Sequence, residues 1–266
     1  MPKTRITKFK QMKQNGEKIT MITAYDAATA EIVDSAGIDS VLVGDSVGNV
    51  IQGRENTLGV KLEEMIYHTK IVSRGIKNAH LAADMPFLSY QVSVEDAVNN
   101  AGRLIKEGNA ESVKLEVNEE YIDTVYALNK ASIPVVAHIG LCPQSLHVMG
   151  GYKVQGRNNA DAEQMLHLAH LAEDAGAFLL VLESIPAKLA TIITSSLSIP
   201  TIGIGAGNRC DGQVLVFNDM AGLSPEPLPK FVKKFADGRK IFLKATEKYI
   251  EQVKSRKFPT KKNSYE

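Results

Sequence analysis

Short apolar runs that end on a chemically active side chain recur along this sequence and constrain its fold more than any other feature. Residues 41–44 form one such run, directly before Asp45 and Ser46. Other runs end in the same way, at Asp84, Glu116, His138 and Glu183. Continuous apolar runs separated by helical patterns are typical of a parallel sheet that is buried on both faces. Parallel strands bring their carboxyl ends together, so we expect these side chains to face one site.

Eight segments qualify as strands, and helical patterns alternate with them. They are expected at residues 19–24, 41–44, 80–84, 112–116, 135–139, 178–183, 201–204 and 212–216. No linker divides the chain, and its 266 residues suit a single (βα)8 barrel of about 250 residues. We therefore predict one α/β domain over residues 1–266, a (βα)8 TIM barrel with an N-terminal helix at 5–18 and a long C-terminal helix at 229–255. A doubly wound open sheet is the alternative, but polar groups at most strand ends suit a closed ring better.

The composition bears on partners and on location. A net charge of +1 gives no overall attraction to nucleic acid or to an acidic membrane. The longest apolar run, residues 177–182, is far shorter than the roughly 20 residues of a membrane span. The first residues lack the apolar core of a signal peptide, so we expect a cytoplasmic protein. Its two cysteines, Cys142 and Cys210, are then expected to be reduced thiols.

Three carboxylates, those of Asp45, Asp84 and Glu116, follow successive predicted strands at intervals of about one strand–helix unit. Facing one pocket, they would repel one another unless a cation lay among them. Oxygen ligands with positions left for water suit Mg²⁺. Alternatively, each carboxylate caps a helix or meets a lysine. That explanation is the better one for any single residue, but it is weaker for three at the same structural position.

Four further side chains are candidates for the site, each with a structural alternative. Lys114 precedes Glu116 by two residues and so shares its face of the strand; it pairs either with a substrate carboxylate or with one of the acids. Ser46 either donates a hydrogen bond to the substrate or caps a helix. Glu183 ends the most apolar strand, where a desolvated carboxylate is a good general base unless an Arg or Lys holds it. His138 is either a structural, hydrogen-bonded residue or a further contact of the site.

Six motifs lie at or near the expected strand ends. They are Thr-Ala-Tyr-Asp at 23–26, Val-Gly-Asp-Ser at 43–46, Asp-Met-Pro-Phe at 84–87, Gly-Gly-Tyr-Lys-Val-Gln-Gly-Arg at 150–157, Val-Leu-Glu at 181–183 and Gly-Ile-Gly-Ala-Gly at 203–207. Together they resemble the motifs of the ketopantoate hydroxymethyltransferase family, from about residue 19 to the tail. The resemblance implies a (βα)8 barrel of the phosphoenolpyruvate/pyruvate type that usually assembles as a homodecamer.

The same resemblance implies roles for individual residues. Mg²⁺ is expected at Asp45 and Asp84, with Glu116 nearby as a further metal-site residue. Contacts to the 2-oxo acid are implied at Ser46, Asp84 and Lys114, and from their places at the strand ends we expect Asp45 and His138 to contact it as well. Glu183 matches the position of the proton acceptor.

The reaction implied by the resemblance transfers a hydroxymethyl group from 5,10-methylenetetrahydrofolate to 3-methyl-2-oxobutanoate. It gives 2-dehydropantoate and tetrahydrofolate, through an enolate stabilised by Mg²⁺, on the route to pantothenate and coenzyme A. One alternative is a Mg²⁺-dependent lyase or mutase of the same superfamily that acts on another 2-oxo acid, which the motif at 150–157 argues against. The other is a barrel without catalysis that serves in assembly or ligand binding, and the acids at the strand ends argue against it.

Three positions depart from the family pattern. Cys142 stands where threonine is usual, Gly59 where proline is usual, and Asn263 where histidine is usual. None coincides with an expected metal or base position. We therefore expect these departures to bear on loop closure and folate binding rather than on the chemistry.

Overall fold

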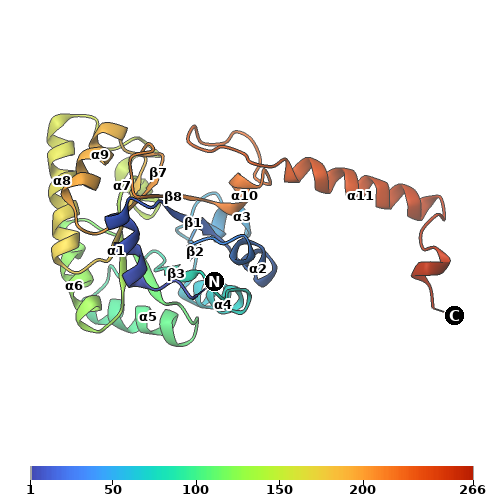
Figure 1. Ribbon diagram of the computed structural model, residues 1–266, viewed down its shortest axis with the longest axis horizontal. Helices are drawn as coiled ribbons and strands as arrows, with labels where there is room; N and C mark the ends of the chain where they lie inside the picture. Colours follow the sequence, from blue (N-terminus) through green and yellow to red (C-terminus); the bar gives the residue numbers. More distant parts are fainter. Residues whose placement is uncertain (1, 266) are drawn as a thin grey trace. The chain divides into compact units, whose positions relative to one another are not determined.

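The computed structural model describes residues 2–265, and its central feature is a closed barrel of eight parallel strands (Figure 1). The strands are β1 Ile19–Thr23, β2 Ser40–Val43, β3 His80–Asp84, β4 Ser112–Glu116, β5 Val135–Gly140, β6 Leu179–Glu183, β7 Thr201–Ile204 and β8 Gly212–Leu215. Each strand pairs with the next, and β8 pairs back onto β1. The predicted barrel is thereby confirmed and the open sheet excluded. No predicted strand boundary is wrong by more than one residue.

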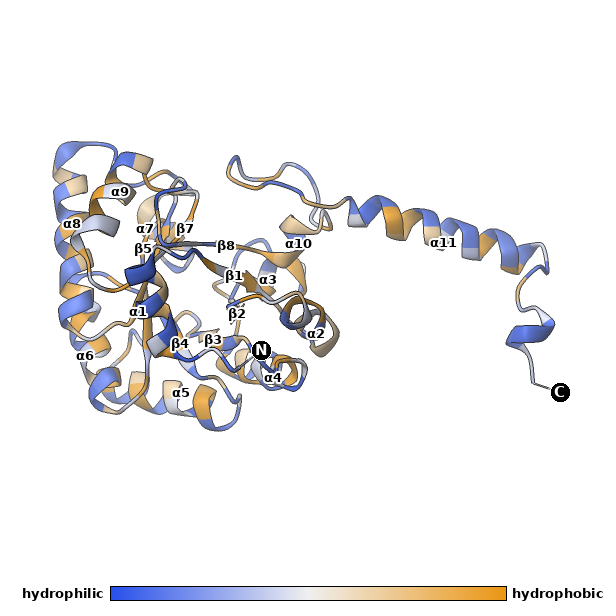
Figure 2. Ribbon diagram, in the orientation of Figure 1, coloured by the Kyte–Doolittle hydropathy of each residue, from blue (hydrophilic) through white to orange (hydrophobic). Residues whose placement is uncertain are grey.

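One helix precedes the first strand, and helices and short helical turns connect the strands. They are α1 Ile6–Asn15, α2 Ala27–Ser35, α3 Val47–Val50, α4 Leu62–Gly75, α5 Val94–Lys106, η1 Glu119–Tyr121, α6 Ile122–Lys130, η2 Pro143–Ser145, α7 Leu146–Met149, α8 Asn159–Asp174 and α9 Ala187–Ser196. In α5 the Ser93 side chain caps the first turn by accepting from the Asp96 N–H. Its apolar positions Ala97, Ala101 and Leu104 are buried, and Figure 2 shows polar and apolar residues alternating along α5 and α8. Such amphipathic helices bury one face and leave the other in water.

Helix α1 fills the amino-terminal end of the barrel. Phe9 and Met12 are buried in one apolar cluster with inward-facing strand residues. The helix predicted over 5–18 is too long, because it ends at Asn15. Gly16 takes a left-handed conformation with φ of 72°, which a glycine adopts without strain. Its N–H then returns to the carbonyls of the last turn and ends the helix.

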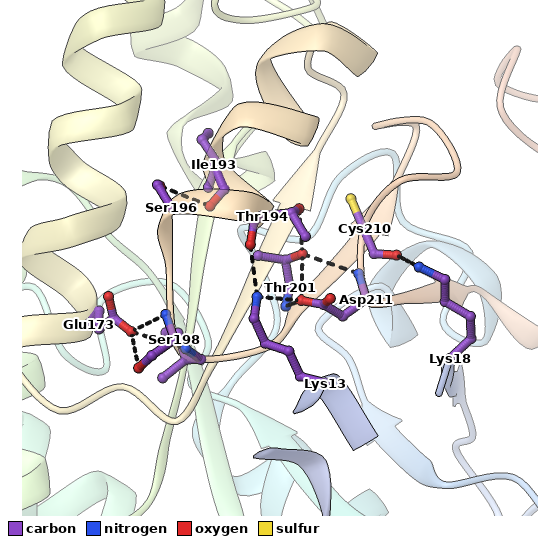
Figure 3. A network of polar contacts seen from close by, with 11 residues as sticks. Lys13, Lys18, Glu173, Ile193, Thr194, Ser196, Ser198, Thr201, Cys210 and Asp211 are labelled. Carbon is purple, nitrogen blue, oxygen red and sulfur yellow. Dashed lines mark hydrogen bonds and ion pairs between the residues drawn. The ribbon is translucent and has the colours of Figure 1, made fainter. Parts of the chain in front are cut away.

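A polar network joins α1 to the last two strands at this closed end (Figure 3). Asp211 Oδ2 lies 2.8 Å from Lys13 Nζ and accepts from the Thr201 N–H at 2.9 Å. The hydroxyls of Thr194 and Thr201 are 2.7 Å apart, and Lys18 Nζ donates to the Cys210 carbonyl at 2.7 Å. Side chains thus reinforce the barrel between β7 and β8, where the strands pair over only two positions.

The remaining residues, Phe217–Glu266, form a compact unit separate from Met1–Val216, although we predicted a single domain. This second unit holds α10 Phe217–Met220, α11 Gly238–Lys254 and η3 Lys261–Asn263. The helix predicted over 229–255 is wrong for residues 229–237. The N–H groups of Phe235 and Gly238 donate to the carbonyls of Met220 and Ala221. The segment before α11 is therefore bonded to the turn after α10 instead of to itself.

None of the helices in the described part of the chain combines the length and the apolar character needed to cross a membrane.

Candidate active site

The side chains singled out from the sequence gather at the carboxyl end of the barrel. Asp84, Glu116 and Glu183 are the last residues of β3, β4 and β6, His138 lies near the end of β5, and Asp45 and Ser46 follow β2. The register places Asp84 beside Lys114 and Glu116 beside His138. Carboxyl ends of barrel strands are where (βα)8 enzymes carry their active sites.

Asp84 lies between a cation and a backbone donor. Its Oδ1 is 2.9 Å from Lys114 Nζ, and its Oδ2 accepts from the Asp45 N–H at 3.0 Å. Burial raises the pKa of Asp84 to about 6 although Lys114 opposes the shift, and the Asp45 charge adds to it. Burial lowers the pKa of Lys114, but the charges of Asp84 and Asp45 outweigh it and the net pKa is raised. Lys114 thus forms an ion pair with an acid of the site, and its contact with a substrate carboxylate stays a prediction.

Glu116 is a buried carboxylate that is only half satisfied. Its Oε1 accepts from the Gln144 N–H at 2.9 Å, whereas Oε2 has no hydrogen-bond partner within the described residues. Burial, and next the charge of Asp45, raise the pKa of Glu116 to about 8. A buried acceptor without a donor is costly, so this end of the barrel favours an added positive charge.

Gln144 is a site residue that the sequence did not indicate. Its Nε2 donates to Asp45 Oδ2 and to the Met85 carbonyl, each at 2.9 Å. Its Oε1 accepts from the Tyr90 hydroxyl at 2.9 Å and from Gln91 Nε2 at 3.1 Å. The length of the loop over 140–160 indicates that this stretch is functional. Nothing in the sequence, however, indicates that the uncharged amide of Gln144 within this loop contacts Asp45.

Ser46 hydrogen-bonds a second residue that the sequence did not single out. Its Oγ is 2.8 Å from the hydroxyl of Tyr25, which is buried, and burial raises the pKa of Tyr25 strongly. Ser46 makes no capping hydrogen bond to α3, so the helix-cap explanation is wrong. Tyr25 is therefore a neutral hydroxyl group whose hydrogen bond with Ser46 orients the serine hydroxyl beside Asp45.

Glu183 and His138 form a neighbouring pair, with His138 Nε2 3.2 Å from Glu183 Oε2. Neither imidazole nitrogen makes a well-directed hydrogen bond within the described residues. Burial, and next the charge of Lys114, lower the pKa of His138, so its ring is neutral near pH 7. The Glu183 side chain is 16% exposed, against 3% for Asp84, and among residues 2–265 no Arg or Lys pairs with it. The alternative of a Glu held by such a cation is therefore wrong.

Gly140 allows the close approach behind this pair. It adopts φ of 102°, and a Cβ there would lie 2.2 Å from the carbonyl oxygen of Glu183. That carbonyl accepts from the Leu141 N–H at 2.9 Å. Only glycine fits this contact, which keeps the ends of β5 and β6 together.

The donor set has the character of a partly open cation site rather than a closed cage. Across residues 2–265, no group of three or more His, Cys, Asp or Glu side chains converges closely enough to enclose a metal ion. The structure does provide neighbouring aspartates at 45 and 84, and the unpartnered Oε2 of Glu116. Mg²⁺ is commonly bound through one or two carboxylates, with water and substrate in its other positions. These residues fit such an ion better than an all-protein cage.

The closed parallel barrel with acids and a lysine at its carboxyl end defines a (βα)8-barrel enzyme. Solved structures of the same fold include phosphonopyruvate hydrolase in complex with oxalate and Mg²⁺, with a TM-score of 0.64, 11% identity and coverage of 99% of this chain and 93% of that chain. Another is 2,3-dimethylmalate lyase, a PEP mutase/isocitrate lyase superfamily member, with a TM-score of 0.59, 15% identity and coverage of 97% and 90%.

The sequence profile of ketopantoate hydroxymethyltransferase matches residues 3–261, and the chain belongs to this family. It is 53% identical over 263 residues to the 3-methyl-2-oxobutanoate hydroxymethyltransferase of Clostridium novyi (strain NT), covering 99% of this chain and 96% of the relative. It is 55% identical over 259 residues to that of Enterococcus faecalis (strain ATCC 700802 / V583), covering 97% and 94%. The family expected from the motifs is confirmed.

Proposed function

We propose that the chain transfers a hydroxymethyl group from 5,10-methylenetetrahydrofolate to 3-methyl-2-oxobutanoate. The products are 2-dehydropantoate and tetrahydrofolate, in the cytoplasmic synthesis of pantothenate and coenzyme A. One observation carries the proposal: in a chain of this family, an accessible carboxylate, Glu183, lies beside a buried cluster of acids and a lysine. In that arrangement the carboxylate can remove a proton from a substrate while the lysine binds the negative charge of the substrate's own carboxylate.

Asp45 and Asp84 are proposed to hold a Mg²⁺ ion, with Glu116 near enough to bind it through water. The support is electrostatic, since burial raises the pKa of Asp84 and of Glu116 and the charge of Asp45 adds to both shifts. A cation lying among these carboxylates would relieve the repulsion from Asp45. When bound, Mg²⁺ would supply a Lewis acid that stabilises negative charge developing on the C2 oxygen of the substrate.

Lys114 and Ser46 are proposed to bind the carboxylate of the 2-oxo acid. Lys114 is a buried cation at the strand ends, and Tyr25 holds the Ser46 hydroxyl in place. Asp45, Asp84 and His138 line the rest of this binding site. A buried cation and a fixed hydroxyl donor favour an anionic substrate over a neutral one.

Glu183 is proposed to remove the proton from C3 of the bound acid. Its carboxylate is not neutralised by a cation and is the more accessible partner of the pair with His138. Water adds to the methylene carbon of the folate and both of its C–N bonds break, which releases formaldehyde and leaves tetrahydrofolate with its nitrogens protonated. The carbanion carbon then attacks the formaldehyde carbon, and the resulting alkoxide takes up a proton to become the hydroxymethyl group. No group of the chain has to carry the one-carbon unit, because the folate carries it.

A homo-oligomer, and in particular a decamer, is proposed from the family resemblance and from α11. Ile241, Phe242 and Leu243 are 61%, 64% and 58% exposed, and Gly238 is the only buried residue of this helix within its described length. Consecutive exposed apolar residues of this size usually mark an interaction surface. A second copy of the chain is the partner we propose.

The test is an assay with 3-methyl-2-oxobutanoate and methylenetetrahydrofolate, with the products followed by NMR. We expect 2-dehydropantoate to form with Mg²⁺ present, to stop with EDTA, and to return when Mg²⁺ is added. Asp84→Ala should remain inactive at any Mg²⁺ concentration. Cleavage of the 2-oxo acid without folate would favour a lyase of the superfamily, and full activity without metal would exclude the metal site.

A further inference from the structure

Gln144 contacts more parts of the active site than any of the residues that the sequence indicated. It lies in η2 and is 5% exposed. Its amide nitrogen, its amide oxygen and its backbone N–H all form hydrogen bonds. The side-chain amide bonds Asp45 Oδ2 and the carbonyl of Met85, the neighbour of Asp84. The backbone N–H bonds Glu116 Oε1. One residue therefore connects the loops after β2 and β3 with the last residue of β4.

The hydrogen bonds around Gln144 fix the direction in which its amide points. Tyr90 Oη accepts from the Glu116 N–H at 3.2 Å, so its own hydrogen is free to donate to Gln144 Oε1. Gln91 Nε2 can only donate, and it contacts the same oxygen. The amide nitrogen must then face Asp45 Oδ2 and the Met85 carbonyl, which are both acceptors.

These hydrogen bonds direct the amide of Gln144 to one carboxylate oxygen of Asp45, and the other carboxylate oxygen has no donor in the described part of the chain. Gln144 occupies Oδ2 at 2.9 Å, and no donor contacts Oδ1 within the described residues. A carboxylate held through one oxygen keeps a fixed orientation and remains able to bind a cation through the second. The same residue fixes Glu116 Oε1 and leaves Glu116 Oε2 without a partner.

We propose that Gln144 is the positioning residue of the cation site, holding Asp45 and Glu116 so that one oxygen of each is presented to the ion. The proposal rests on the proposed function, since it assigns Gln144 a role toward the Mg²⁺ site described there. Partners that orient the ligands of a metal typically change its affinity 10- to 100-fold when they are removed. A structural role alone predicts lower stability with unchanged affinity.

The experiment measures binding of Mn²⁺, as a paramagnetic substitute for Mg²⁺, to the full chain by electron paramagnetic resonance, without substrate. Gln144→Met keeps a similar volume and the backbone N–H to Glu116 but removes the amide. We expect its dissociation constant for Mn²⁺ to rise roughly 10- to 100-fold. Tyr90→Phe removes one donor to Oε1 and keeps the bond to Asp45, so a smaller rise is expected. Tyr90→Phe can test the proposal by itself if Gln144→Met does not fold.

Thr194→Val is the matched control, because it breaks a buried side-chain hydrogen bond at the closed end of the barrel (Figure 3). It should lower the melting temperature and leave Mn²⁺ affinity at the wild-type value. Wild-type affinity in both Gln144→Met and Tyr90→Phe would overturn the positioning role while leaving the metal site intact. No Mn²⁺ binding by the wild type, or undiminished binding by Asp84→Ala, would instead overturn the metal site and this inference with it.

Discussion

Lys114 Nζ lies 2.9 Å from Asp84 Oδ1, and both side chains are almost entirely out of water, at 9% and 3% exposed. A buried charge that loses its partner is strongly destabilising, whereas an intact pair is close to neutral. The ion pair is therefore a condition for keeping Asp84 ionised at the strand ends. Two variants test this dependence in the absence of substrate.

Lys114→Met should lower the free energy of unfolding by about 3 kcal/mol at neutral pH in EDTA, because it leaves Asp84 buried and unpaired. Urea unfolding measures this loss. The double variant Lys114→Met/Asp84→Asn should recover most of it, since neither charge remains. Equal stability of the single variant and the wild type would show that Asp84 does not depend on Lys114.

Glu183→Gln separates the base from the cation site. The amide is nearly isosteric but cannot accept the C3 proton, so the variant should bind Mg²⁺ and 3-methyl-2-oxobutanoate normally. In D₂O without folate, the wild type should exchange the C3 hydrogen, which is visible as loss of its NMR signal. The variant should exchange it slower by roughly 10²–10⁴, the contribution of one general base. Near-normal exchange would move the base assignment to His138.

Glu116→Gln should stabilise the metal-free protein while weakening its binding of Mg²⁺. Burial and Asp45 raise the pKa of Glu116 to about 8, which means that its charged form is disfavoured in the fold. At about pH 8 in EDTA we expect a gain of about 2 kcal/mol in urea unfolding, reduced because the new amide also lacks a partner. Addition of Mg²⁺ should reverse the order of the two proteins. A variant less stable than the wild type in EDTA would contradict this assignment.

His80, beneath the active site, should make stability depend on pH. It packs edge-on against Phe9 at 5.4 Å. Burial lowers its pKa from 6.5 to about 4, Lys3 adds to the shift, and Glu111 opposes it. The unfolded chain therefore binds a proton more readily than the folded chain between these values. Above pH 6.5 His80 is neutral in both states and adds no pH dependence, and the free energy of unfolding falls as pH drops through that window toward 4.

We expect the wild type to lose about 3 kcal/mol more stability than His80→Gln on going from the upper to the lower limit of this window, measured by urea unfolding. His167→Gln, which changes an exposed histidine of α8, should follow the wild-type curve. Parallel curves for the wild type and His80→Gln would show that His80 does not titrate differently on unfolding.

The apolar residues of α11 should hold copies of the chain together. Sedimentation of the wild type at micromolar concentration should give a species larger than a monomer. Phe242→Asp and Leu243→Asp should shift it to smaller species, because each places a charge at the contact. Lys248→Asp, at an exposed polar position of the same helix, should have little effect. A purely monomeric wild type would count against the assembly.

The strands could be predicted because a buried parallel strand is recognisable from a few consecutive residues. Asp84, Glu116 and Glu183 could be placed for the same reason, since the end of a strand fixes where its last side chain lies. Gln144, Tyr90 and Tyr25 could not, because their partners are set by the course of loops rather than by any period. Residues 229–237 looked helical by composition, but hydrogen bonds to the turn after α10 override that preference.

The side chains of α1 close the amino-terminal end of the barrel with apolar groups. We therefore expect substrates to reach the acids at the strand ends from the carboxyl end of the barrel. The small 2-oxo acid is then expected to bind before the larger folate, and a helix that touches none of the reacting groups determines this order.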